Sequence, residues 1–283
     1  MRIALINSGL GLLAAAAALH RMRPDADLVL ATDPDGMPWG PRTPDDIADR
    51  ALLCARAAVA YRPDVLVMAC NTGSVHALEP MRAAFEPDIP VIGTVPAIKP
   101  AAAAHRLVAI WATVATTASA YQRRLIAEFG GSALVTPVAC PGLADAVDAG
   151  DEAATAAAVK AAAAETPPGC QAVVLGCTEY ELTADRIRAA VPGAVTFGSA
   201  DAVAAQALRR IPASDAPPHP AQAGCGGARP DGARLGTVRV LLSGRPALLP
   251  SAALRYPEGR LLAPLVRVGN TDREPAADPA VTR

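Results

Sequence analysis

The sequence predicts an α/β fold of two similar halves, each a parallel four-stranded sheet flanked by helices, related by a pseudo-twofold axis with a cleft between them. Three observations predict it. Short, nearly uninterrupted apolar runs alternate with helical stretches, as is typical of parallel strands buried on both faces. These runs form two sets of four that resemble each other. The 283 residues, 52% of them hydrophobic, are also enough for two compact units.

The expected strands alternate with helices along the chain. They cover residues 3–6, 28–31, 65–69 and 91–92, and then 107–111, 133–135, 172–175 and 195–197. Residues 63–72 align with 169–178 when Cys70 and Cys177 are superposed, which indicates an internal duplication. Each of these cysteines follows the carboxyl end of a strand, where open α/β sheets place their ligands. Two such ends that face each other would form the cleft.

The predicted domain boundaries follow from this repeat. Residues 1–95 form the first half, residues 96–199 the second, and a helix near 200–211 returns to the first. Beyond it, residues 212–236 are rich in Pro and Gly and are typical of a linker. Apolar runs at 238–242 and 261–268 predict a small hairpin, and 274–283 a disordered tail. We assign no function to the segment 212–283.

Composition excludes several partners. The net charge of −1 and the absence of a Lys/Arg run disfavour nucleic acid and anionic membrane surfaces. No apolar segment reaches the roughly 18–20 residues that span a bilayer. Arg2 and the apolar stretch after it resemble a secretory signal, but the polar turn at Asn7-Ser8-Gly9 favours strand, turn and helix instead. The sequence predicts a small-molecule partner and leaves a homodimer open.

The six cysteines form no CxxC pair. Reduced thiols in the cytoplasm are therefore expected rather than disulfides or structural zinc. The four histidines lack metal-ligand spacing, so no metal is expected. Neither lysine, Lys99 nor Lys160, lies in a strand-end context that favours a Schiff base, and we expect no pyridoxal cofactor.

Two turns carry the predicted chemistry. Cys70-Asn71-Thr72 and Cys177-Thr178-Glu179 each place a thiol and a hydroxyl where a strand gives way to a helix. Backbone N–H groups there lower a thiol pKa and bind carboxylates. A buried free cysteine is often inert, but two in duplicated contexts favour function. Opposed thiols suit the transfer of an α-proton from one face of an amino acid to the other, because one removes a proton while the other donates one.

At this point the sequence resembles bacterial glutamate racemases, within the aspartate/glutamate racemase family. The resemblance covers about residues 1–210 and rests on six motifs in the family's order: Asn7-Ser8-Gly9, Pro38-Trp39-Gly40-Pro41-Arg42-Thr43, Cys70-Asn71-Thr72, Ala112-Thr113-Val114-Ala115-Thr116, Ala139-Cys140-Pro141 and Gly176-Cys177-Thr178-Glu179-Tyr180.

The resemblance implies an active site between two α/β domains, no cofactor, and Cys70 and Cys177 as the two bases. It also implies formation of D-glutamate from L-glutamate for peptidoglycan synthesis in the cytoplasm. The implied substrate-binding residues are Ser8, Trp39, Gly40, Asn71, Thr72, Thr113, Thr116 and Thr178.

This sequence departs from the glutamate racemase pattern beside each cysteine. Asn7 stands where that family has an Asp, and Glu179 stands where it has a His. Asp148 matches an acidic position that supports this His. Glu179 is similar to the version in aspartate and hydantoin racemases, and an ionised carboxylate there raises a thiol pKa while still able to act as a base. We therefore add Asn7, Glu179 and Asp148 to the catalytic candidates and expect one of two crowded acids to hold a proton.

Four alternatives stay open. Aspartate or a related amino acid racemase and a diacid isomerase share the chemistry. Gly9, Gly11 and Ala14 fit G-x-G-x-x-A between a strand and a helix, with Asp33 placed as a ribose-binding acid, which favours an NAD-dependent oxidoreductase. A racemase-like binding protein without catalysis is the fourth.

Overall fold

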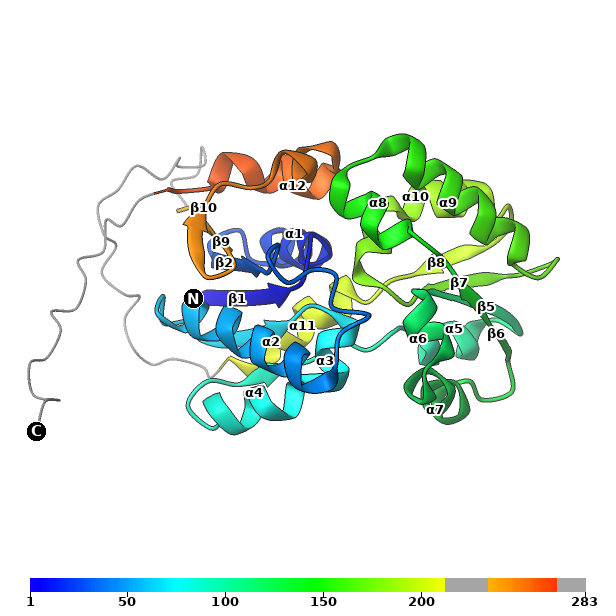
Figure 1. Ribbon diagram of the computed structural model, residues 1–283, viewed down its shortest axis with the longest axis horizontal. Helices are drawn as coiled ribbons and strands as arrows, with labels where there is room; N and C mark the ends of the chain where they lie inside the picture. Colours follow the sequence, from blue (N-terminus) through cyan, green and yellow to red (C-terminus); the bar gives the residue numbers. More distant parts are fainter. Residues whose placement is uncertain (212–233, 269–283) are drawn as a thin grey trace, which may run out of the picture.

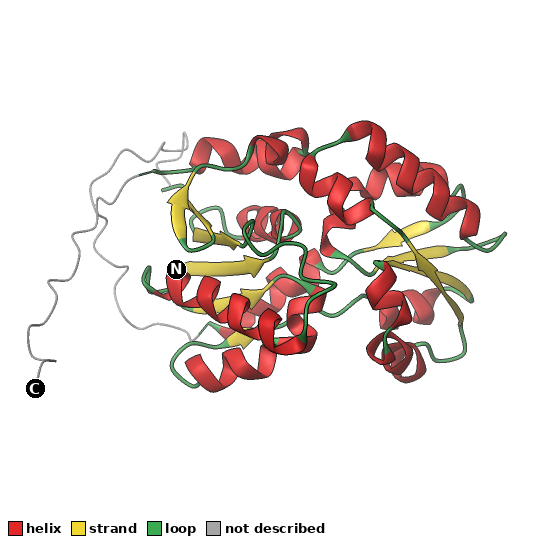
Figure 2. Ribbon diagram, viewed as in Figure 1, coloured by secondary structure: helices red, strands yellow, loops and turns green. Residues whose placement is uncertain are grey.

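The computed structural model describes residues 1–211 and 234–268, which form two sheets with helices on their faces (Figures 1 and 2). The second sheet is built from residues of the second half, and the first sheet combines strands of the first half with two strands of the C-terminal segment. The predicted α/β class with parallel sheets flanked by helices is confirmed. Among the described residues, no helix is long and apolar enough to cross a membrane.

The first sheet has six strands, not the four that were predicted. Its strand order is β10-β9-β2-β1-β3-β4. The strands are β1 (Arg2–Asn7), β2 (Asp27–Thr32), β3 (Val65–Met68), β4 (Val91–Ile92), β9 (Val238–Leu242) and β10 (Arg245–Ala247). β9 pairs parallel to β2 and β10 pairs antiparallel to β9. The correction has a physical cause, since β2 would otherwise leave an edge of unpaired backbone groups.

The second sheet has the four predicted strands, all parallel. They are β5 (Leu107–Ala112), β6 (Leu134–Ala139), β7 (Ala172–Leu175) and β8 (Val195–Phe197). Their order, β6-β5-β7-β8, repeats the order β2-β1-β3-β4 of the first half. β3 and β7 therefore occupy equivalent positions beside the first strand of each half. Every residue of both strands is buried, which explains their continuous apolar sequences.

The helices begin at recognisable capping residues. Thr43 accepts a hydrogen bond from Asp46 before Pro44 opens α2, and Asp151 caps α9 in the same way. The helices of the first half are α1 (Leu12–Met22), α2 (Pro44–Val59), α3 (Asn71–His76), α4 (Leu78–Phe85) and α11 (Ala200–Arg210). Those of the second half are α5 (Ile98–Ala104), α6 (Val114–Ala118), α7 (Ala120–Phe129), α8 (Leu143–Ala149), α9 (Glu152–Glu165) and α10 (Ala184–Ala190), with the 3₁₀ helix η1 (Thr178–Thr183).

Helix α1 lies at the centre of the molecule. Its alanines at 14–18 are all buried, because the helix packs against α11, η1 and the C-terminal α12 (Pro257–Leu262). Small side chains allow this close approach from several directions. The alanine run therefore has a packing role that composition alone did not reveal.

The C-terminal segment spans both halves. After β10 come η2 (Ser251–Arg255), α12 and η3 (Ala263–Leu265), and Figure 1 shows α12 over α1 with α8 beside it. The Tyr256 hydroxyl donates to the Val147 carbonyl in α8 at 2.6 Å. The predicted hairpin exists, but its second strand is β10 and not 261–268, because residues 261–265 end α12 and form η3 and Val266 makes only an isolated parallel bridge to Val238. The predicted tail, 274–283, and most of the predicted linker lie outside the described residues.

Candidate active site

Cys70 lies at the carboxyl end of β3 and caps α3. Its backbone is extended, with φ −143° and ψ 128°, and its sulfur accepts the Gly73 N–H at 3.4 Å. The residue is only 6% exposed. Burial raises the pKa of Cys70 to about 12, the charge of Glu179 adds to this, and backbone N–H groups of Gly73, Ser8 and Thr72 oppose it. Cys70 is therefore a neutral thiol at pH 7.

Cys177 occupies the equivalent place after β7. Its backbone angles, φ −132° and ψ 137°, are nearly those of Cys70, and η1 follows it directly. The thiol donates to Glu179 Oε2 at 2.9 Å. Burial and the Glu179 carboxylate raise the pKa of Cys177 well above its ordinary value.

The two half-sites contact each other directly. Asn7 Nδ2 donates to the Ala69 carbonyl at 2.7 Å in its own half and to Thr178 Oγ1 at 3.2 Å in the other. Asn71 Nδ2 donates to the Gly176 carbonyl at 2.9 Å. Asn71 Oδ1 is buried and has no hydrogen-bond partner among the described residues. An acceptor of this kind favours a ligand that brings an N–H or O–H donor.

Two carboxylates crowd the Cys177 side. Glu179 Oε1 accepts the Gly11 N–H at 3.3 Å, and Asp148 Oδ1 accepts the Leu10 N–H at 2.7 Å. Burial and the charge of Glu179 raise the pKa of Asp148 to about 8, despite the opposing bond from Leu10. Asp148 is therefore mostly protonated at pH 7, as expected for one of two acids in a small space.

The glycine turn after β1 is filled by side chains of the second half. A Cβ atom at Gly9 would overlap the Asp148 carboxylate, and one at Gly11 would overlap Thr178 Oγ1 and Glu179 Oε1. The glycines thus admit the second half where a dinucleotide would need room for its pyrophosphate. These contacts weigh against the NAD-dependent alternative.

Asp33, the ribose-binding candidate of that alternative, is 2% exposed. It accepts hydrogen bonds from the indole N–H of Trp39 at 3.0 Å, from Arg50 at 3.3 Å and from the Ser243 hydroxyl at 3.1 Å. With its oxygens engaged in this network, Asp33 is a structural acid. It joins the C-terminal hairpin to the first half.

The predicted substrate-binding residues lie in different surroundings. Ser8 donates to Asn7 Oδ1 at 3.2 Å, and Thr72 is partly buried in the first turn of α3. Thr113 caps α6 at the end of β5, where its hydroxyl donates to the Thr116 hydroxyl at 3.0 Å. Strand β5 pairs with β7, so these two hydroxyls lie at the same sheet edge as the Cys177 turn.

Trp39 is buried in the core, whereas Gly40 borders open space. Trp39 is 1% exposed and packs beside Gly73, within the core cluster that contains Cys70. Trp39 therefore packs against the turn that carries Cys70 and stabilises it from the core side. Gly40 borders open space, since nothing lies within 4 Å of a Cβ placed there.

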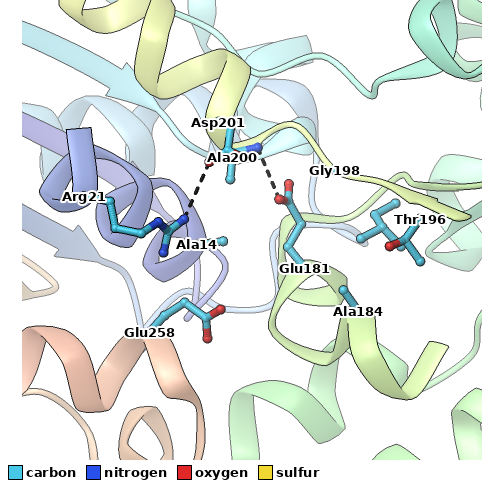
Figure 3. Close-up of a pocket in the computed structure, with 10 residues that line it drawn as sticks. Ala14, Arg21, Glu181, Ala184, Thr196, Gly198, Ala200, Asp201 and Glu258 are labelled. Atoms are coloured by element: carbon cyan, nitrogen blue, oxygen red, sulfur yellow. Dashed lines mark hydrogen bonds and ion pairs between the residues drawn. The ribbon is translucent and has the colours of Figure 1, made fainter. Parts of the chain in front are cut away.

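A pocket of about 200 Å³ lies behind the Cys177 turn (Figure 3). Its lining includes none of the predicted site residues, but it includes Glu181, which sequence reasoning missed. Glu181 accepts hydrogen bonds from Ser199 and Ala200. Only its position two residues after Glu179, on the same short helix, could have drawn attention to it.

The remaining described cysteines form no disulfide. Cys54, Cys140 and Cys170 are buried and free, and Cys225 lies outside the described residues. No group of three metal-ligating side chains occurs within residues 1–211 and 234–268.

Known proteins share this sequence and fold. A model of the Asp/Glu/Hydantoin racemase family matches residues 7–207. Glutamate racemase of Pseudomonas entomophila (strain L48) is 33% identical over 214 residues, which cover 74% of this chain and 80% of that protein.

Among solved structures, Aquifex pyrophilus glutamate racemase has a TM-score of 0.59 and 31% identity, over 75% of this chain and 84% of that one. Escherichia coli glutamate racemase, in complex with L-glutamate and an activator, has a TM-score of 0.72 at 24% identity, over 90% and 91%. The second likeness concerns the fold. Together with the family match, these relatives show that this chain is an amino-acid racemase that belongs to the Asp/Glu/Hydantoin racemase family.

Proposed function

We propose that this enzyme racemises an acidic amino acid, with glutamate as the first choice, by two-base proton transfer between Cys70 and Cys177 without a cofactor. One observation carries the proposal: the two cysteines follow equivalent strands of the two halves, and hydrogen bonds from Asn7 to Thr178 and from Asn71 to Gly176 join their turns directly. Two bases on opposite faces of one carbon are what an inversion at Cα requires.

The contact between Cys177 and Glu179 supplies a route to the reactive thiolate. Glu179 takes the thiol proton across the 2.9 Å hydrogen bond, and the Cys177 thiolate then removes the proton from Cα. Cys70, a neutral thiol, donates its proton to the opposite face and is left as the thiolate. The reverse reaction begins from that state, and exchange with solvent restores the first state between turnovers.

The polar groups around the thiols fit an amino acid. Asn71 Oδ1, which lacks a partner among the described residues, can accept from the substrate ammonium group. The hydroxyls of Ser8, Thr72, Thr113 and Thr116 can donate to carboxylates. Donors placed at the α-carboxylate stabilise the negative charge that develops when Cα loses its proton.

Glutamate is proposed because the curated relatives are glutamate racemases. Its D-enantiomer would serve peptidoglycan synthesis, and the free thiols favour the cytoplasm. Aspartate is the second candidate, because Glu179 resembles the aspartate and hydantoin racemase version of the motif. A homodimer stays part of the proposal without bearing on the mechanism.

Purified enzyme incubated with L-glutamate or L-aspartate in heavy water tests the proposal. Loss of optical rotation should accompany deuterium incorporation at Cα, followed by proton NMR. Cys170→Ser is the matched control, since this thiol is buried outside the site, and it should remain active. Absence of exchange with either acid would remove the racemase proposal, and binding of the acids without exchange would favour a non-catalytic binding protein.

A further inference from the structure

Glu181 links the Cys177 turn to the segment that returns the chain to the first half. Its Oε1 accepts the Ser199 backbone N–H and the Ser199 hydroxyl, both at 2.8 Å. Its Oε2 accepts the Ala200 N–H at 3.2 Å. Figure 3 shows the Glu181 carboxylate directed at Ala200, with Gly198 beside it. One carboxylate on η1 therefore makes three hydrogen bonds to the crossover between β8 and α11.

The crossover leads into a helix of the first half. α11 buries Val203, Ala204 and Ala207 and packs against α1 and β3, and β3 is the strand that ends at Cys70. Ser199 precedes α11 but makes no side-chain capping bond to it. Glu181 caps the helix from another element instead, and a carboxylate is favourable at that end of a helix.

Gly198 makes this approach feasible. A Cβ atom there would overlap Glu181 Oε2 and lie 2.8 Å from Glu181 Cδ. Because three hydrogen bonds hold the Glu181 carboxylate, it could not rotate to make room for a side chain at position 198 without losing some of them. The absence of a Cβ at Gly198 therefore allows the carboxylate to lie against the backbone in this one orientation.

We propose that Glu181 is a positioning residue, which holds η1, and with it the pair Cys177 and Glu179, in place relative to the half that carries Cys70. The inference rests on the proposed two-base function and extends it. The other end of η1 is held by Thr178, which accepts from Asn7. Two residues of η1, Thr178 and Glu181, thus tie it to Asn7 and to the crossover into α11, and these ties restrict movement of Cys177 relative to Cys70. Misplacement by about 1 Å costs a catalytic group roughly 10²-fold in rate.

The test compares Glu181→Ala, Glu181→Gln and Gly198→Ala with Asp185→Ala. Asp185 is an exposed acid on the adjacent α10 and pairs with Arg188, so its loss should leave activity unchanged. Each protein is assayed for racemisation and for iodoacetamide alkylation of Cys70 and Cys177, resolved by peptide mass spectrometry from pH 6 to 10.

For Glu181→Ala and Gly198→Ala we expect kcat to fall roughly 10²-fold with a smaller change in KM. Cys177 should react faster and titrate at lower pH, because it leaves its buried contact with Glu179, while Cys70 reacts as in the wild type. Glu181→Gln keeps one acceptor oxygen and should lie between these variants and the wild type.

Unchanged Cys177 reactivity and kcat in Gly198→Ala and Glu181→Gln would overturn the proposal, including the case in which Glu181→Ala does not fold. Equal acceleration of both thiols, together with a lower Tm, would show a merely structural role and would also overturn it. If the wild type does not racemise either acid, the proposed function fails, but the ratio of Cys177 to Cys70 alkylation still decides the role of Glu181.

Discussion

The Cys70 and Cys177 half-sites share one backbone design and differ in charge. Both cysteines are extended residues that follow a buried strand at equivalent places of duplicated sheets. Cys70 has the neutral Asn7 nearby and accepts a backbone N–H. Cys177 donates to Glu179, with Asp148 behind it.

The repeated fold thus places both thiols at equivalent strand ends, whereas individual side chains set the charge beside each one. In the proposed mechanism Glu179 accepts a proton on the Cys177 side. On the Cys70 side, backbone N–H groups favour a thiolate, and no carboxylate of that half within the described residues is hydrogen-bonded to the sulfur. Substitutions on each side test this asymmetry.

The largest effect is expected from replacing either thiol. Cys70→Ser or Cys177→Ser should reduce racemisation by roughly 10³–10⁴-fold in both directions, because each direction needs one base and one acid. Each variant should still exchange the α-hydrogen of one enantiomer with heavy water, and the two variants should favour opposite enantiomers. Proton NMR with separate enantiomers checks this, and retained racemisation in either variant would contradict the two-base scheme.

Removal of the acid from the Cys177 side alone should have the next largest effect. Glu179→Gln should slow racemisation roughly 10²-fold, because the thiol loses its proton acceptor. The charge of Glu179 raises the pKa of Cys177, of Cys70 and of Asp148, so all three should fall in the variant. Thiol alkylation against pH measures the first two. A Cys177 profile equal to that of the wild type would show that Glu179 does not control this thiol.

Making the two sides more alike should destabilise the first. In Asn7→Asp the introduced carboxylate loses the donor that Asn7 gives to the Ala69 carbonyl. We expect a loss of about 1–3 kcal/mol in the free energy of unfolding. The ionised form is disfavoured in this buried place, so the loss should grow as pH rises above 4. Urea unfolding at several pH values tests this, with Asp185→Asn as the surface control.

The last prediction concerns Asp148 and the pH dependence of stability rather than the rate of reaction. Its pKa is raised from 3.8 to about 8 in the folded enzyme, so the folded state binds more protons than the unfolded state between these values. Stability should therefore fall as pH rises from 4 to 8. Asp148→Asn should flatten this decline while it keeps an acceptor for the Leu10 N–H. Parallel Tm curves for variant and wild type across that range would contradict the raised pKa.

The sequence alone predicted the eight strands of the two repeats. Buried strands such as β3 and β7 are apolar along their whole length, and the more exposed edge strands β6 and β8 still form short apolar runs. The sequence also singled out Cys70 and Cys177, since a thiol at a strand end is a local feature. The strand with which β9 pairs could not be predicted from the sequence. Pairing of β9 with the edge of β2 joins residues more than 200 positions apart, and no local pattern encodes it.

The same division holds within the site. Glu179 was recognised because it is two residues from Cys177. Its hydrogen bond with Gly11, and the rise that its charge causes in the pKa of Asp148, arise only when the two halves pack together. Likewise, Trp39 proved to support the Cys70 turn through its contact with Gly73.

The fold class and the two thiols could be predicted from the sequence, because the apolar pattern of a buried strand and the position of a cysteine after it depend only on neighbouring residues. Tertiary structure decided which thiol is paired with an acid, which acid holds a proton, and that Glu181 reaches the crossover to α11. These properties depend on distances between groups far apart in the chain and on their shared removal from water, which only the folded arrangement sets.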